Sequence, residues 1–167
     1  MTLEELNSLS NQEAGIEFTK CCGSKKWVSQ MVENRPYDDE VVLLEVAKKS
    51  WLGCTESDWL EAFTHHPRIG DVESLSKKYA NTREWAGIEQ KSVDSASKTV
   101  IEKFAERNII YEDKFVFIFI VCATGKSAEE MLVIMESRIE NEYSDELKIA
   151  MGEQHKITVL RLKKLLA

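Results

Sequence analysis

Two adjacent histidines lie directly before a proline in the segment Phe63–Asp71, which reads FTHHPRIGD. A residue that precedes proline is disfavoured in the α region and adopts an extended conformation. We therefore expect a helix to end here and His66 to present its imidazole where the helix becomes a loop. Imidazole exchanges a proton near neutral pH, so His66 is a candidate acid–base group, with a structural or solvated histidine as the alternative.

Two charged residues could complete such a site. Glu89 follows Trp85 by four residues in WAGIEQ, so on a helix its carboxylate shares a face with a residue that we expect to be buried. On a helical wheel, Arg161 falls between Ile157 and Leu165, at the edge of the apolar stripe of the last helix. A charge in that place needs an anionic partner, which is either a protein carboxylate or a substrate carboxylate. For Glu89 the alternative is an exposed surface position.

The Gly125–Ser127 sequence GKS follows an apolar run, as in a phosphate-binding loop. That loop requires a glycine five residues before the G of GKS, where this chain has Ile120. Ser127 and Glu130 instead form a capping-box pattern that begins a helix. We therefore expect no nucleotide site.

A metal site is not expected either. His65, His66 and Asp71 lie close in sequence, but no cysteine or H-E-x-x-H pattern accompanies them. Adjacent histidines at a helix end point in different directions, so both cannot readily bind one ion.

Composition points to one soluble helical domain. The 167 residues are 43% hydrophobic and 31% charged, and only 7 glycines and 2 prolines interrupt them. The net charge of −7 disfavours nucleic acid as a partner. The longest apolar run, Phe115–Ala123, is too short to span a membrane, and the polar N-terminus lacks the pattern of a signal peptide. Four cysteines without a C-x-x-C pair suit reduced thiols, so we expect a cytoplasmic protein with no membrane partner.

The elements that would position these residues are mostly helices. Capping residues and helical spacing predict helix starts at Thr2, Ser24, Asp38, Thr55, Ser127 and Ser144. Further helices are expected over 72–79, from about 82 and from about 95. Propensity favours a strand at Phe115–Ala123 (FVFIFIVCA), but a buried extended segment and the core of a helix are equally compatible with it. The predicted fold is a single compact all-α domain over residues 1–167.

Several segments, taken together, resemble the 2-oxo-4-hydroxy-4-carboxy-5-ureidoimidazoline (OHCU) decarboxylase family. They are HPRIGD at 66–71, EQ at 89–90, FIFIVCATGKSAEEML at 117–132 and AMGEQHKITVLRLKKLL at 150–166. Their order and spacing match the family over nearly the whole chain. The resemblance implies an all-α homodimer without a cofactor, which acts in urate breakdown after urate oxidase and 5-hydroxyisourate hydrolase.

The resemblance also implies roles for individual residues. His66 resembles the catalytic histidine, Glu89 its carboxylate partner and Arg161 the substrate-binding arginine, whereas His65 would be a bystander. The remaining wall of the pocket is implied to comprise Pro67, Ala86, Gln90 and the backbone of Phe119, Ile120, Val121, Cys122 and Ala123. The chain departs from the family pattern at Ala86, where serine is common, and at Phe117–Phe119, where F-I-F replaces F-P-F.

The implied reaction needs no external electron sink, because the carbon that bears the carboxylate adjoins a C=N bond of the ring. The protein would orient this small-molecule substrate, exclude water and transfer protons. Arg161 would orient the anion, Glu89 would fix the tautomer of His66, and protonation on one face would yield (S)-allantoin. Two alternatives stay open. One is a non-catalytic helical interaction module in which these residues form an internal polar network, and the other is a decarboxylase of a related ureide.

Overall fold

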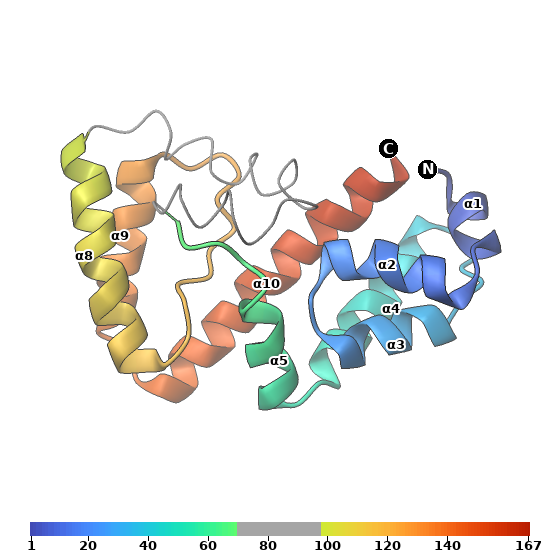
Figure 1. The fold of residues 1–167 in the computed structure, drawn as a ribbon, viewed down its shortest axis with the longest axis horizontal. Coiled ribbons are helices and arrows are strands. Elements are labelled where there is room, and N and C mark those ends of the chain that lie inside the picture. Colours follow the sequence, from blue (N-terminus) through green and yellow to red (C-terminus); the bar gives the residue numbers. More distant parts are fainter. Residues whose placement is uncertain (70–97) are drawn as a thin grey trace. The chain divides into compact units, whose positions relative to one another are not determined.

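The computed structural model describes residues 1–69 and 98–167, and every regular element within these ranges is an α-helix (Figure 1). The helices are α1 (Leu3–Ser8), α2 (Asn11–Cys21), α3 (Lys25–Glu33), α4 (Glu40–Leu52), α5 (Glu56–Phe63), α8 (Lys98–Phe115), α9 (Ala128–Ile139) and α10 (Tyr143–Leu166). The all-α prediction is confirmed for these residues. The helices predicted over 72–79 and from 82, and the helix start near 95, lie outside them.

Local side-chain caps begin most of these helices. The helix starts predicted at Thr2 and Ser127 are confirmed, and a capping box forms at each, with a glutamate three residues after the hydroxyl residue. A further box, between Ser10 and Glu13, begins α2, a helix that was not predicted. The cap of α4 is Asp39, whose carboxylate accepts from the Val42 amide at 2.8 Å, so the prediction of Asp38 was wrong by one residue.

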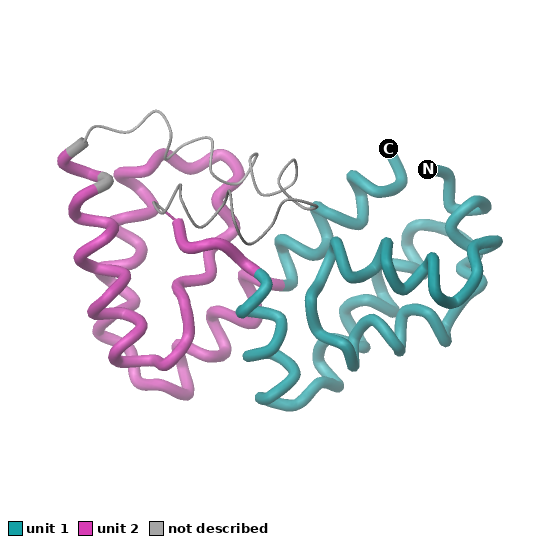
Figure 2. The backbone as a smooth tube through the Cα atoms, viewed as in Figure 1, with its two compact units in different colours: residues 1–65, 155–167 teal, residues 66–154 magenta. Residues whose placement is uncertain are grey.

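Contacts between Cα atoms divide the chain into two compact units (Figure 2). Unit 1 comprises residues 1–65 and 155–167, and unit 2 comprises residues 66–154. In unit 1, the rings of Phe18 and Trp27 meet edge to face with centroids 6.1 Å apart, and the Trp27 indole donates to the Ala47 carbonyl at 3.0 Å. These aromatic and polar contacts join α2, α3 and α4 in one core.

Unit 2 contains α8, α9, the first part of α10 and the connection between α8 and α9. The ring of Tyr111 contacts those of Phe115, Phe117 and Phe119, at centroid distances of 4.7, 5.9 and 5.4 Å. Residues 117–123 form neither a helix nor a strand, and most of their side chains are buried. For residues 117–123 the strand and the helix core are therefore wrong, and a buried segment without regular structure is observed.

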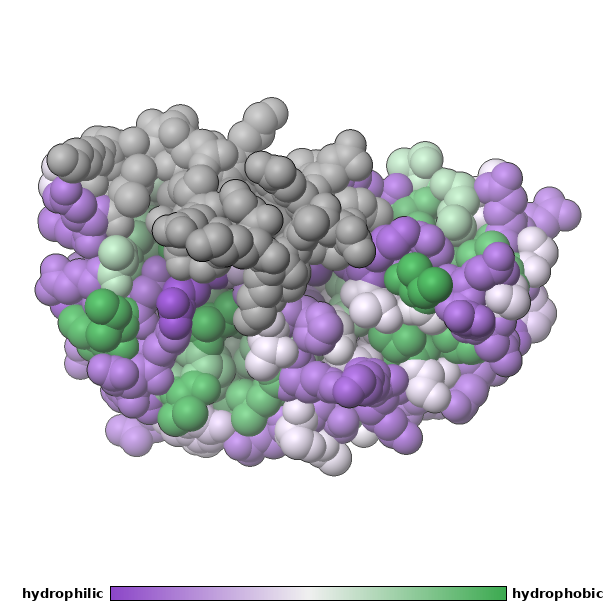
Figure 3. Space-filling model, in the orientation of Figure 1, coloured by the Kyte–Doolittle hydropathy of each residue, from purple (hydrophilic) through white to green (hydrophobic). Residues whose placement is uncertain are grey.

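Most charged residues within the described ranges are exposed or partly exposed. On the face drawn in Figure 3, hydrophilic side chains predominate among the coloured atoms, and apolar side chains gather only in small separate groups. Among the helices that the structure describes, none is both long and apolar enough to cross a membrane.

Candidate active site

His66 lies just beyond α5, as the following proline predicted. The helix ends at Phe63, and His66 is buried with 8% of its surface exposed. Its Nε2 lies 2.6 Å from Oε1 of Gln154, a fully buried residue of α10. His66 is therefore held inside unit 2 and is not a solvated surface histidine.

The residues that follow His66 are fixed on α8. The side-chain amide of Asn108 donates to the carbonyl of Ile69 at 2.9 Å, and both groups are buried. The Arg68 guanidinium binds both carboxylate oxygens of Glu112, with 2.6 Å from Nη2 to Oε2. This pair is partly exposed and adds little stability by itself, but its two-point geometry fixes the direction of the loop.

The predicted backbone wall, Phe119–Ala123, is buried in the same unit, and its alternate residues are held by side chains. Arg138 donates to the carbonyl of Ile120 at 2.8 Å. The amide of Cys122 donates to Glu153 at 2.7 Å, and its carbonyl accepts from Lys126 at 2.9 Å. Because Glu153 and Gln154 are consecutive in α10, one helical turn contacts both this segment and the ring of His66.

A buried ionic network lies beside this segment. Arg138 binds Glu146 with 2.8 Å from Nε to Oε1, and it lies 4.7 Å from the centroid of the Phe119 ring. Tyr111 donates its hydroxyl proton to the same carboxylate, and Asn141 donates to the other oxygen at 2.9 Å. Burial raises the pKa of Tyr111 far above its usual value, and Glu146 adds to this increase, so the phenol remains a donor.

Sequence reasoning missed Arg138, Glu146, Glu153 and Gln154, although helical spacing contained a signal for three of them. Arg138 continues the buried stripe of Met131 and Met135 on α9, and Glu146 and Gln154 lie four residues either side of the buried Ala150. Polar residues at the apolar positions of a helix need buried partners. Glu153 carries no comparable signal.

Arg161 belongs to unit 1, where it is partly buried on α10. Its positive charge lowers the pKa of the buried thiols of Cys21 and Cys22. Burial outweighs this effect and raises the pKa of Cys22 to about 12, and it raises the pKa of Cys21 further. Both thiols are therefore neutral at physiological pH and do not supply an anion for the guanidinium.

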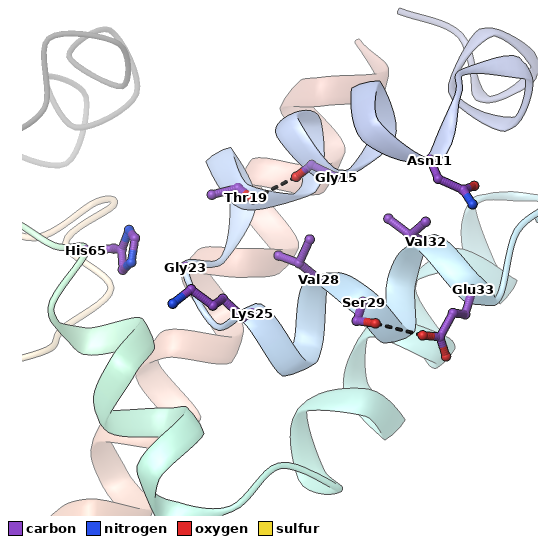
Figure 4. Close-up of a pocket in the computed structure, with 10 residues that line it drawn as sticks. All are labelled: Asn11, Gly15, Thr19, Gly23, Lys25, Val28, Ser29, Val32, Glu33 and His65. Carbon is purple, nitrogen blue, oxygen red and sulfur yellow. Dashed lines mark hydrogen bonds between the residues drawn. The ribbon is translucent and has the colours of Figure 1, made fainter.

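Unit 1 also contains a pocket of about 560 Å³ between α2, α3 and the end of α5 (Figure 4). His65 lies at one end of the pocket and Asn11 at the other, and none of the predicted site residues within the described ranges lines it. The ring of His65 lies against Gly23, where an added Cβ would come within 2.2 Å of its Cγ. The structure thus places His65 in a packing contact of unit 1 and His66 in unit 2.

The structure brings part of the predicted site together in unit 2, namely His66, Pro67 and Phe119–Ala123, all buried. Ala86, Glu89 and Gln90 lie outside the described residues. Within the described ranges, no group of three or more histidine, cysteine or acidic side chains is arranged to hold a metal ion.

Comparison with known proteins agrees with these motifs. The family model described as OHCU decarboxylase matches residues 7–163. The uric acid degradation bifunctional protein TTL of Arabidopsis thaliana is 37% identical over 150 residues, which cover 89% of this chain and 46% of that protein. This chain therefore spans less than half the length of the Arabidopsis protein. A 2-oxo-4-hydroxy-4-carboxy-5-ureidoimidazoline decarboxylase of Haloferax volcanii is 25% identical over 163 residues, which cover 97% of this chain and 94% of that protein.

Solved structures show the same fold. An OHCU decarboxylase crystallised in the presence of (S)-allantoin superposes with a TM-score of 0.76 and 35% identity, over 90% of this chain and 96% of that one. An (S)-allantoin synthase structure has a TM-score of 0.74 over 99% of this chain and 54% of that one, and at 18% identity it supports the fold alone. On the family match over residues 7–163, this chain belongs to the OHCU decarboxylase family.

Proposed function

We propose that this protein decarboxylates OHCU to (S)-allantoin in urate breakdown, without a cofactor. Family membership over residues 7–163 and the 35% identity to a solved OHCU decarboxylase support the proposal. The observation that carries it is the setting of His66. The histidine of the HPRIG motif is buried, and Gln154 holds its ring in the unit that also contains residues 119–123.

The substrate itself can accept the electrons that decarboxylation releases. The carbon that bears the carboxylate adjoins a ring C=N bond, so when CO2 leaves, the bonding pair moves toward that bond and nitrogen carries the charge. The nitrogen then takes up a proton, which neutralises this charge. The hydroxyl group loses a proton while the neighbouring carbon gains one, which leaves the carbonyl of neutral allantoin. The protein therefore has to orient the substrate, exclude water and move protons.

We assign these tasks to the three residues of the family motifs. His66 transfers the protons, because imidazole changes its charge near neutral pH. Arg161 orients the substrate anion through its planar fork of donors. Glu89 stabilises the charged imidazole, since a carboxylate beside a histidine favours its protonated form.

Backbone amides of residues 119–123 offer further contacts for the substrate. The Ile120 carbonyl and both the N–H and the C=O of Cys122 form hydrogen bonds. Within the described part of the chain, no hydrogen bond involves the backbone of Phe119 or Val121. Both residues are buried, and buried amide groups require partners. We assign the backbone groups of Phe119 and Val121 to the polar edge of the substrate.

The test uses the unstable substrate made freshly from urate by urate oxidase and 5-hydroxyisourate hydrolase. Circular dichroism follows the appearance of (S)-allantoin with wild type, His66→Ala, Glu89→Gln and the neighbouring control His65→Ala. We expect rapid turnover in wild type and His65→Ala and a loss of roughly a hundredfold or more in His66→Ala and Glu89→Gln. A wild-type trace no faster than spontaneous decay would overturn the proposal and favour the interaction module or a related ureide.

We further propose that residues 1–167 act as one domain in a cytoplasmic homodimer that binds neither nucleic acid nor membranes. The family match spans both units, and α10 contributes residues to each of them. All four cysteines are free and buried, as suits a reducing compartment. Light scattering coupled to size exclusion should give about twice the chain mass of 19.1 kDa, and a monomer mass would refute the dimer.

A further inference from the structure

The contact between His66 and Gln154 has a defined direction. The distance of 2.6 Å joins the ring Nε2 to the amide oxygen Oε1. A carbonyl oxygen accepts hydrogen bonds and cannot donate them, so Nε2 carries the proton. In the neutral ring the other nitrogen, Nδ1, is then the acceptor.

This partner differs from a carboxylate in how it responds to the charge of the ring. The Nε2 proton is present in both the neutral and the protonated imidazole, so the amide can accept it throughout a proton-transfer cycle. Gln154 does not ionise, and it is fully buried on α10, where its neighbour Glu153 holds the Cys122 amide at 2.7 Å. The ring can thus gain and lose a proton without losing its anchor.

We infer that Gln154 is a positioning residue that holds neutral His66 in the tautomer protonated at Nε2, the role that the family resemblance implied for Glu89, and so assigns proton exchange to Nδ1. The tautomer concerns the folded protein alone, whereas its consequence for turnover rests on the proposed decarboxylase function. The two parts can therefore fail separately.

The first test reads the ring directly, by NMR of protein labelled with nitrogen-15 in its three histidines. We expect the neutral His66 ring to be protonated at Nε2, with a slowly exchanging Nε2 proton that identifies the buried hydrogen bond. His66→Asn assigns the signal by removing it. Gln154→Met keeps the length of the side chain but removes the acceptor, so the slowly exchanging proton should disappear. Gln12→Met makes the same change at an exposed position of α2 and should leave the signal unchanged.

The second test separates positioning from stability. In Gln154→Met, kcat should fall by roughly tenfold or more while KM stays within about twofold, since the geometry of the base is altered but the substrate contacts are not. Gln154→Glu retains an acceptor oxygen and should keep the Nε2 proton signal, which provides a second variant if the methionine variant does not fold.

A His66 ring protonated at Nδ1, or an Nε2 proton unaffected in Gln154→Met, would overturn the inference. Equal kcat in wild type and Gln154→Met would refute the positioning role. If wild type shows no decarboxylation while the NMR signals are as expected, the proposed function fails and the tautomer assignment stands.

Discussion

Single polar side chains hold the candidate site from the inside of unit 2. Gln154 binds the ring of His66, and Arg138 binds the carbonyl of Ile120, while its charge is balanced by Glu146. Each of these partners is buried, so the hydrogen bonds are shielded from competing water. Removal of one partner leaves another buried polar group without a hydrogen bond, which lowers the free energy of unfolding. The contribution of each contact therefore depends on the other contacts of the group.

Arg161→Lys tests whether the substrate is held by a planar fork of donors. Lysine keeps the positive charge but loses the two-point contact, so we expect KM to rise roughly tenfold while kcat changes by less than about threefold. Progress curves of (S)-allantoin formation at several substrate concentrations measure both constants. Lys163→Arg makes the reverse change at an exposed position of α10 and should alter neither of them. An unchanged KM in Arg161→Lys would contradict the bidentate role.

Arg138→Met tests the buried ion pair. The substitution leaves the Glu146 carboxylate, which is fully buried, without its cation, and it removes the donor to Ile120. We expect the free energy of unfolding in urea to fall by about 3–5 kcal/mol. Arg107→Met breaks the exposed pair with Glu136 and should cost less than about 1 kcal/mol. Similar losses in the two variants would be inconsistent with this view of the network.

At the scale of elements, two connections carry unusual backbone requirements. The connection from α2 to α3 contains Gly23, against which the ring of His65 packs. The end of α8 contains Val116, which has a φ of 62° and is 87% exposed. A β-branched residue is disfavoured in this left-handed region, so the chain leaves α8 through a strained position just before the buried segment 117–123.

Gly23→Ala tests the first connection. Its new Cβ would lie 2.2 Å from the His65 ring, so the ring or the backbone must shift, and we expect a loss of about 1–3 kcal/mol in the free energy of unfolding. Gly152→Ala is the matched control, because no atom of the described residues outside the backbone of α10 lies within 4 Å of its Cβ position. That variant should gain about 0.5–1 kcal/mol from the helical preference of alanine. Effects of the same sign would argue against the packing contact.

Val116→Gly tests the second connection. Glycine adopts the left-handed conformation without a penalty, and the exposed valine buries little apolar surface. We therefore expect the free energy of unfolding to rise by about 1 kcal/mol. The same change at Val133, exposed inside α9, should instead cost a few tenths of a kcal/mol. Urea denaturation of both variants decides the sign, and a destabilised Val116→Gly would disprove the strain.

The stability of the whole molecule depends on pH, because some groups have a different pKa in the folded and the unfolded protein. Burial, and then the charge of Lys48, lower the pKa of His155 from its ordinary value of 6.5. The Nδ1 atom of His155 is buried, and no hydrogen-bond partner for it is found within the described residues. The capping carboxylates of Glu13 and Asp58 have pKa values lowered by their hydrogen bonds to Ser10 and Thr55, so they titrate in a more acidic range.

The sign of the pH dependence at His155 follows from linkage. The unfolded chain binds a proton near pH 6.5, whereas the folded protein binds it only at lower pH. The stability associated with neutral His155 is therefore complete above pH 6.5 and decreases as the pH falls below that value. We expect His155→Gln to lose less stability than wild type between pH 7 and pH 5, as measured by urea unfolding at each pH. Parallel curves for the two proteins would refute this account.

Features that arise from neighbouring residues could be predicted from the amino-acid sequence. Capping residues three positions from their partners predicted the starts of α1 and α9, and the proline after His66 predicted that the helix ends before it. The missing glycine at Ile120 excluded a phosphate loop, and Ser127 is indeed a helix cap. The ordered motifs indicated the family that the comparisons confirm.

Contacts between groups far apart in the sequence could be found only in the folded protein. The conformation of residues 117–123 depends on their packing against the Tyr111 ring. The apolar sequence alone is compatible with a strand, a helix or a buried extended segment. The partner of His66 is Gln154, 88 residues away, and helical spacing shows only that this glutamine is buried. Local propensity selects conformations over a few residues, whereas pairing across such a separation is chosen by the packing of the entire core.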